Sequence, residues 1–172
     1  MIMKKCFILI FLSLTFTHLH SQETPSLTHD GFITLTGEWD GEYIVTQPDG
    51  SFDTLDMKID ATITSIDRGI AVDFLIADRE GNSELDTDTI LISEDGSELD
   101  MGRIWTITEI AVDAGDTILM LDRKEQTDNN ETHYLRSILR AGPDKFAILT
   151  AVKRKAGEDY FLEEQYRFTR KR

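Results

Sequence analysis

The stretch that decides the fold is GEWDGEY, residues 37–43, which is the first strand-like segment after an apolar N-terminus. Successive side chains of an extended chain point to opposite faces. Trp39, Gly41 and Tyr43 therefore share one face, and the acidic residues between them share the other. We expect the tryptophan to face a core and the acids to face water. Gly37 and Gly41 flank the indole on its own face and leave room for it.

The rest of the chain repeats strand and turn. In residues 55–63, apolar and polar side chains alternate with the period of a half-buried strand. The expected strands cover residues 37–45, 54–64, 72–76, 85–91, 104–110, 117–122, 132–140, 145–152 and 160–169. The connectors are rich in glycine and asparagine, which supply the positive φ angles of tight hairpins. The pattern predicts an all-β fold, a single antiparallel up-and-down β-barrel of about 8–10 strands.

The tripeptide Gly37-Glu38-Trp39, on the first strand of an all-β meander, resembles the opening motif of the lipocalins and their calycin relatives. The resemblance implies that Trp39 plugs the closed end of a lipocalin-like barrel and that a basic residue of the last strand packs across it. Arg167 and Arg170 are the candidates, and Arg170 is favoured because it shares strand parity with Tyr166. An arginine on the face of a tryptophan contributes about 0.5–2 kcal/mol. The disulfide common in secreted lipocalins has no counterpart here.

A narrower resemblance concerns haem. The Gly-x-Trp-x-Gly pattern of residues 37–41 is similar to the opening of the nitrobindin-type haem barrels, although Tyr43 stands where those proteins have a third glycine. That group uses a histidine as its iron ligand. Beyond residue 21 the candidates are His29, on an N-terminal arm, and His133, which shares a strand face with Leu135. A single strand histidine is more often structural, so no haem is expected.

The N-terminus MIMKKCFILIFLSLTFTHLHSQ predicts a secretory signal peptide. Lys4 and Lys5 precede an apolar run over residues 6–17, which is shorter than the roughly 20 residues of a membrane-spanning helix. The single cysteine, Cys6, is the first residue of that run and precedes nearly all of it, so we expect neither a lipid anchor nor a disulfide. The expected organisation is a signal peptide at 1–21, an N-terminal arm at 22–35 and one barrel domain at 36–172. The protein is then secreted or periplasmic.

The formal net charge of −14 argues against nucleic acid and anionic membranes as partners. It is compatible with a basic protein partner, but a solvated outer face is the favoured interpretation. The segment 78–89 resembles a calcium loop only in part. Its glycine falls at the fourth place and no glutamate closes the twelfth, so no Ca²⁺ site is expected.

No catalytic signature is present. The mature chain has no cysteine, no Gly-x-Ser-x-Gly and only two histidines, and acid pairs arise by chance in a chain with 32 acidic residues. Glu164 and Arg103 are expected on the inner face. Because a buried charge must be paired, each needs a polar partner or a wet cavity.

We therefore expect a non-catalytic protein that binds a small, mainly apolar ligand inside the barrel. The alternative is an interaction module, with a filled barrel and an acidic surface that docks a partner. A further alternative, implied by the nitrobindin resemblance, is a haem-binding barrel. The candidate ligand-lining residues are Tyr43, Met57, Val72, Phe74, Met101, Arg103, Trp105, Met120, His133, Leu135, Glu164 and Tyr166.

Overall fold

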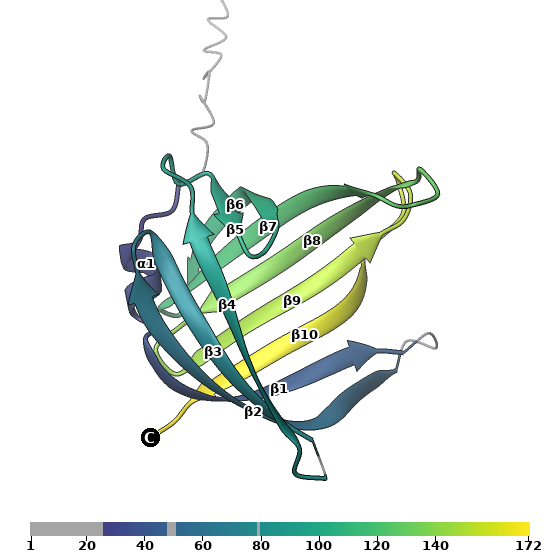
Figure 1. Cartoon of the computed structure of the whole chain (residues 1–172). Helices are drawn as coiled ribbons and strands as arrows, with labels where there is room; N and C mark the ends of the chain where they lie inside the picture. Colours follow the sequence, from purple (N-terminus) through teal and green to yellow (C-terminus); the bar gives the residue numbers. More distant parts are fainter. Residues whose placement is uncertain (1–25, 48–50, 79) are drawn as a thin grey trace, which may run out of the picture.

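The chain forms one closed antiparallel β-barrel with hardly any helix (Figure 1). The computed structural model describes residues 26–47, 51–78 and 80–172. The elements are α1 (Asp30–Ile33), β1 (Gly37–Thr46), β2 (Phe52–Ile66), β3 (Gly69–Ala77), β4 (Ser83–Ile92), β5 (Glu98–Asp100), β6 (Ile104–Asp113), β7 (Asp116–Gln126), β8 (Thr132–Ala141), β9 (Lys145–Lys153) and β10 (Phe161–Arg170). Each strand lies beside its neighbours in sequence, and β1 pairs with β10 to close the barrel. The predicted all-β, up-and-down antiparallel barrel is confirmed.

The alternation of the sequence becomes the two faces of the sheet. On β2, Ile59, Ala61 and Ile63 are buried, while the threonines between and beyond them are exposed. The register with β3 sets Ala61 opposite Phe74 and Ile63 opposite Val72, so these apolar side chains meet inside the barrel. Burial of this face is the main favourable term for folding.

The strand that the sequence analysis did not predict is β5. It has three residues, Glu98–Asp100, and its central Leu99 is fully buried opposite Trp105 on β6. A three-residue strand is too short to show a period of two, so the pattern carries no signal for it.

Residues 26–35 of the expected arm are part of the folded core. Leu27, Phe32 and Leu35 are buried, and Phe32 lies on the single turn of α1. The backbone N–H of Leu27 donates to the carbonyl oxygen of Gly96 at 2.8 Å. Gly96 has a φ of +73° and touches residues 26 and 27 so closely that a Cβ there would collide with the carbonyl of Leu27. The arm therefore covers the closed end of the barrel.

The expected signal peptide at 1–21 lies outside the described residues, as do residues 22–25 of the arm. Within the described part of the chain, no helix has the length and apolar character needed to cross a membrane.

Candidate functional site

The closed end of the barrel has an aromatic floor. Trp39 is fully buried, and its indole Nε1–H donates to the carbonyl oxygen of Leu35 at 2.9 Å. Phe146 meets Trp39 edge to face with ring centroids 6.4 Å apart, and Phe168 stacks on Phe146 at 5.5 Å. These rings form the bottom of the barrel interior.

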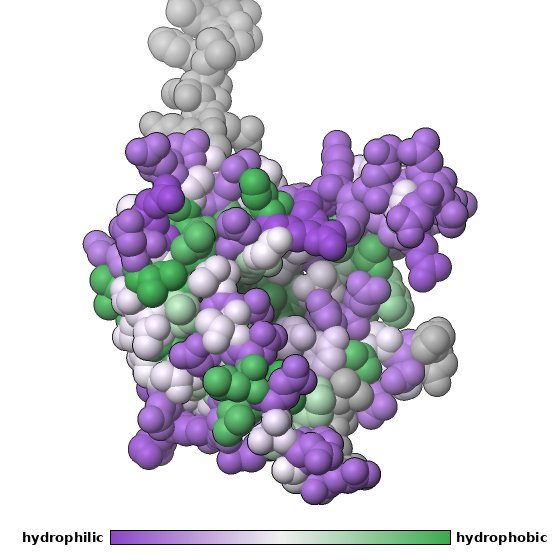
Figure 2. Space-filling view, in the orientation of Figure 1, coloured by the Kyte–Doolittle hydropathy of each residue, from purple (hydrophilic) through white to green (hydrophobic). Residues whose placement is uncertain are grey.

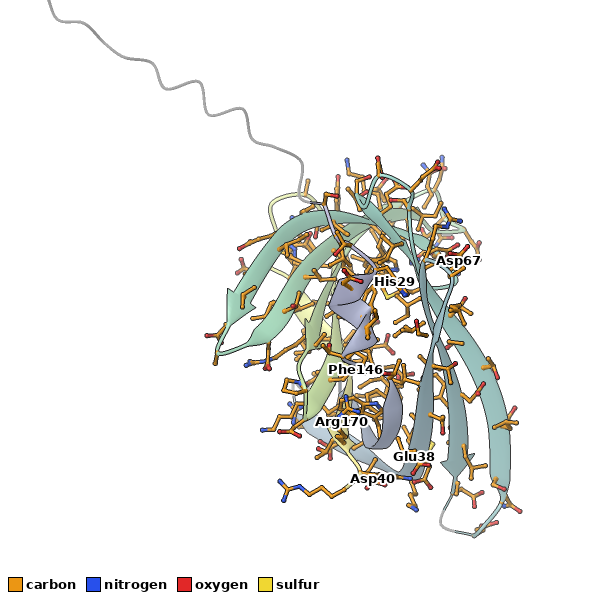
Figure 3. All side chains as sticks on the ribbon, turned by 90° about the vertical axis from the view of Figure 1, so that its left-hand side faces the viewer. His29, Glu38, Asp40, Asp67, Phe146 and Arg170 are labelled. Atoms are coloured by element: carbon orange, nitrogen blue, oxygen red, sulfur yellow. The ribbon has the colours of Figure 1, made fainter. Side chains whose placement is uncertain are left out.

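Arg170 is the cation that lies across Trp39. Its guanidinium carbon is 4.2 Å from the centroid of the indole ring, and its Nη1 donates to the carbonyl oxygen of Thr36 at 2.8 Å. It also donates to the carbonyls of Thr34 and Pro143. Figure 3 shows Arg170 below α1, at this end of the barrel. One side chain thus links the arm, the β8–β9 turn and the floor.

Arg167 has a different position. It is exposed on the outer face, where it donates to the side-chain oxygen of Gln165 at 2.6 Å and lies 3.8 Å from Glu42. The two glycines of the motif also act differently from expectation. A Cβ at Gly37 would crowd the guanidinium of Arg170, and one at Gly41 would collide with the ring of Phe168. They make room for the partners of Trp39 more than for the indole itself.

A cavity of about 180 Å³ lies above the floor. Figure 2 shows this face of the molecule hollowed, with apolar side chains deep in the hollow and polar ones round its edge. The apolar and aromatic lining consists of Ile59, Val72, Phe74, Ile76, Ile90, Met101, Phe146, Ile148, Tyr166 and Phe168. The polar lining consists of Asp86, Asp88 and Thr89. Of the residues expected to line a ligand site, the cavity brings together Val72, Phe74, Met101 and Tyr166.

One side of the cavity is bounded by an incompletely paired strand. β4 pairs with β3 from Ser83 to Leu91, but with β5 only through Leu91 and Ile92. In the described part of the chain, no strand pairs with the other edge of residues 83–90. The short β5 therefore leaves an opening in the barrel wall beside the cavity.

Asp86 and Asp88 are the site residues that sequence reasoning missed. Their register opposite Phe74 and Val72 places them on the cavity side of β4, where both residues remain exposed to solvent. The signal that could have found them is parity with Ile90 on the same strand, which is buried. Leu85 and Leu91 have the opposite parity and are apolar, so the sequence pattern suggested that their face was the inner one.

Tyr43, Glu164 and Tyr166 form a cluster on the inner face. The hydroxyl of Tyr43 donates to Glu164 Oε2 at 2.8 Å, and the two tyrosine rings stack with centroids 4.5 Å apart. Burial, and then the hydrogen bond with Glu164, raises the pKa of Tyr43 well above its usual range. Burial also raises the pKa of Tyr166, with further contributions from the charges of Glu164 and Asp88. Both phenols stay protonated at neutral pH.

Arg103 and Glu164 do not pair with each other. Arg103 is largely exposed and bonds to Glu125, which also accepts from Arg123 Nη2 at 2.9 Å. The guanidinium of Arg123 in turn lies 4.8 Å from the ring centroid of Trp105. Glu164 thus has a polar partner in Tyr43, as a half-buried charge requires. The expectation that Arg103 lies on the inner face is wrong, because its side chain is exposed in the turn between β5 and β6.

The remaining candidates lie away from the cavity. Trp105 is buried in the core, and Leu135 packs against that core. Met57 lies in a separate depression with Ile76. His133 is half-buried and pairs with Glu125 across β7 and β8.

Met120 is a correction, because it lies on the outer face. Its neighbours Leu119 and Leu121 are the buried residues of β7, and Leu119 is opposite buried Leu139 on β8. A strand turns alternate residues to opposite faces, so Met120 points outward.

The described residues contain no group of three or more histidine, cysteine, aspartate or glutamate side chains arranged to hold a metal ion. In the segment that resembles a calcium loop, the carboxylate of Asp78 accepts the backbone N–H groups of Glu80 and Asn82 at 2.9 Å. From Ser83 onward the segment is strand β4. Its first acid therefore organises a hairpin turn.

No model of a known protein family matches this sequence, and no curated protein matches it in sequence. In three dimensions the chain is similar to the crystal structure of Rv2717c from M. tuberculosis, with a TM-score of 0.57 and 11% identity, over 86% of this chain and 100% of that one. It is also similar to the S-type phycobiliprotein lyase CPES from Guillardia theta, with a TM-score of 0.48 and 11% identity, over 85% of this chain and 94% of that one. Likeness at this identity concerns the fold alone, and Rv2717c shares the barrel described above.

Proposed function

We propose that this protein binds a small, mainly apolar ligand inside its barrel, without catalysing a reaction. The observation that carries the proposal is the cavity of about 180 Å³ above the aromatic floor. Ten of its lining residues are apolar or aromatic, and it opens at a gap in the wall beside β4. Ligand sites are typically concave and mostly apolar, with a few polar groups at defined positions.

The size of the cavity restricts the ligand. An apolar cavity of about 150 Å³ accepts a molecule the size of benzene. A volume of about 180 Å³ therefore suits one aromatic ring or a short alkyl chain, and larger ligands would extend through the opening. The lining contains no histidine, cysteine or serine, which favours binding over nucleophilic or acid–base catalysis by those residues.

The test is an NMR titration of the protein with toluene, which has the size and polarity that the cavity suits. Signals of Ile59 on β2 and Ile90 on β4, which both line the cavity, should shift in a saturable way. The variant Ile76→Phe fills part of the cavity and should weaken toluene binding at least about tenfold. Leu75→Phe is the matched control, because Leu75 is the next residue on β3 and is 43% exposed on the outer face. Toluene that shifts neither isoleucine would contradict the proposal.

A second candidate function is docking of a basic partner protein, and the free edge of β4 favours it. Leu85 lies on that edge and is 71% exposed, and the strand carries acidic residues that would attract a basic segment. Leu85→Lys should abolish partner capture under this function and leave toluene binding unchanged. Ile76→Phe should do the reverse.

The secreted or periplasmic location is part of the proposal, and the basic and apolar N-terminus supports it. N-terminal sequencing of the protein recovered from its native compartment should give a mature chain that begins near Gln22. A mature chain that retains Met1 would refute export by cleavage.

A further inference from the structure

We propose that the ligand carries a positive charge, and that Asp86 and Asp88 hold that charge at the open side of the cavity. This inference rests on the proposed function, since it concerns the same cavity. It adds the chemical class of the ligand, which is a small amine with an apolar body.

The first argument is position. Asp86 and Asp88 line the same cavity as Phe74, Tyr166 and Phe168. Asp88 and Tyr166 come from different strands, β4 and β10, and line the same cavity, where the charge of Asp88 also helps to raise the pKa of Tyr166. A ligand with its apolar part on the aromatic floor would therefore present its other end to two carboxylates.

The second argument is charge. Among the described residues, no lysine, arginine or histidine forms an ion pair with Asp86 or Asp88. Arg103 and Arg123 are both engaged by Glu125. Within the part of the chain that the structure describes, the two negative charges of the cavity lining therefore have no counter-charge, and they attract a cation and repel an anion.

The third argument compares this lining with the other inward acid. Glu164 accepts a hydrogen bond from Tyr43, so its carboxylate already has a protein partner. Among the described residues, the carboxylate of Asp86 accepts only the backbone N–H of the next residue, Thr87. A competing explanation is that Asp86 and Asp88 merely keep the free edge of β4 from pairing with another strand, because charges discourage such pairing. Under that explanation a cationic ligand has no advantage, and the experiment separates the two.

The experiment titrates the protein with three compounds that share a phenyl ring and differ in their end group. They are 2-phenylethylamine, 2-phenylethanol and phenylacetate, and NMR shifts of Ile59 and Ile90 give each dissociation constant. We expect the amine to bind at least about fivefold more tightly than the alcohol, and phenylacetate to bind most weakly. The preference for the amine should shrink as sodium chloride is raised, while alcohol binding stays constant.

The variant Asp86→Asn/Asp88→Asn should lower the affinity for the amine to that for the alcohol and leave the alcohol unchanged. The matched control is Asp73→Asn. Asp73 lies on the outer face of the same sheet, where it accepts a hydrogen bond from Thr87 at 2.8 Å. Its removal changes the net charge by one unit without altering the cavity.

Equal affinities for amine and alcohol in the unaltered protein would overturn this inference and leave the proposed function intact. Failure of all three compounds and of toluene would overturn both. If the double variant does not fold, the salt titration of the unaltered protein decides, because a salt-independent preference for the amine contradicts a role for the two carboxylates.

Discussion

Arg170 connects distant parts of the chain. The resemblance implied only that a basic residue packs on Trp39, and Arg170 also binds three backbone carbonyls. Its planar guanidinium stacks on Trp39 and donates to carbonyl groups of the arm and of the β8–β9 turn. Lysine cannot reproduce this arrangement, because an ammonium is a compact charge without a planar fork of donors.

We predict that Arg170→Lys lowers the free energy of unfolding by about 2 kcal/mol, because three carbonyl groups lose their donors and the stacking on Trp39 is lost. Arg167→Lys, the same substitution on the outer face of the same strand, should change stability by less than about 0.5 kcal/mol. Urea unfolding followed by tryptophan fluorescence measures both. Equal losses in the two variants would show that the position of Arg170 over Trp39 has no special energetic role.

The orientation of a residue could be predicted from the sequence where its strand is apolar on one face and polar on the other. Trp39 and Arg170 belong to this group, because charged residues or threonine occupy the alternate positions around them. Met120 lies in the run Ile118–Leu121, which is apolar on both faces, so a period of two cannot show which side is buried. The orientation of Asp86 could not be predicted for a different reason. The inner face of β4 is polar along half of the strand, so it resembles an outer face.

At the scale of elements, the arm and β5 shape the two ends of the site. The arm and α1 seal the closed end with Leu27, Phe32 and Leu35. The three residues of β5 are too few to cover the edge of β4, so the cavity keeps its opening. Neither the packing of the arm nor strand β5 could be predicted from the sequence. Both segments are too short to show a periodic pattern of apolar residues.

We predict that Phe32→Ala lowers the free energy of unfolding by about 3–5 kcal/mol, because a buried aromatic ring is replaced by a cavity. Phe32 is 1% exposed, whereas its neighbour Ile33 is 47% exposed. Ile33→Ala is therefore the control, with an expected loss below about 1 kcal/mol. Thermal or urea unfolding checks both variants. A small loss for Phe32→Ala would mean that the arm covers the barrel without stabilising it.

At the scale of the whole molecule, the negative charge is partly balanced where the barrel closes. Asp40 on β1 and Asp60 on β2 are directly opposite each other, which is unfavourable for two like charges. Lys171 binds Asp60 and lies 3.6 Å from Asp40, and Lys58 lies 2.9 Å from Asp60. Their hydrogen bonds, first that of Lys171, lower the pKa of Asp60 to about 2.

We predict that Lys171→Gln lowers the free energy of unfolding by about 1 kcal/mol at pH 7. The pKa of Asp60 is lower in the folded state than its ordinary value of 3.8, so the ionised carboxylate stabilises the fold above about pH 4. That contribution is lost as the pH falls toward about 2. The difference between Lys171→Gln and the unaltered protein should therefore disappear over this range in urea unfolding.

Lys58→Gln is the control for that prediction. The side chain of Lys58 is 69% exposed, and its hydrogen bond lowers the pKa of Asp60 less than that of Lys171 does. Its effect at pH 7 should be the smaller of the two. A loss for Lys171→Gln that persists at pH 2 would assign the effect to packing and not to charge.

The pairing of β1 with β10 also governs when the protein can fold. Arg170 bonds to a carbonyl 136 residues earlier in the chain, so the barrel closes through contacts of very high sequence separation. Proteins dominated by such contacts fold slowly, in milliseconds to seconds, since loop-closure entropy is spent before the contacts form. A ribosome releases β10 last. The barrel therefore cannot close during synthesis until β10 has emerged to pair with β1.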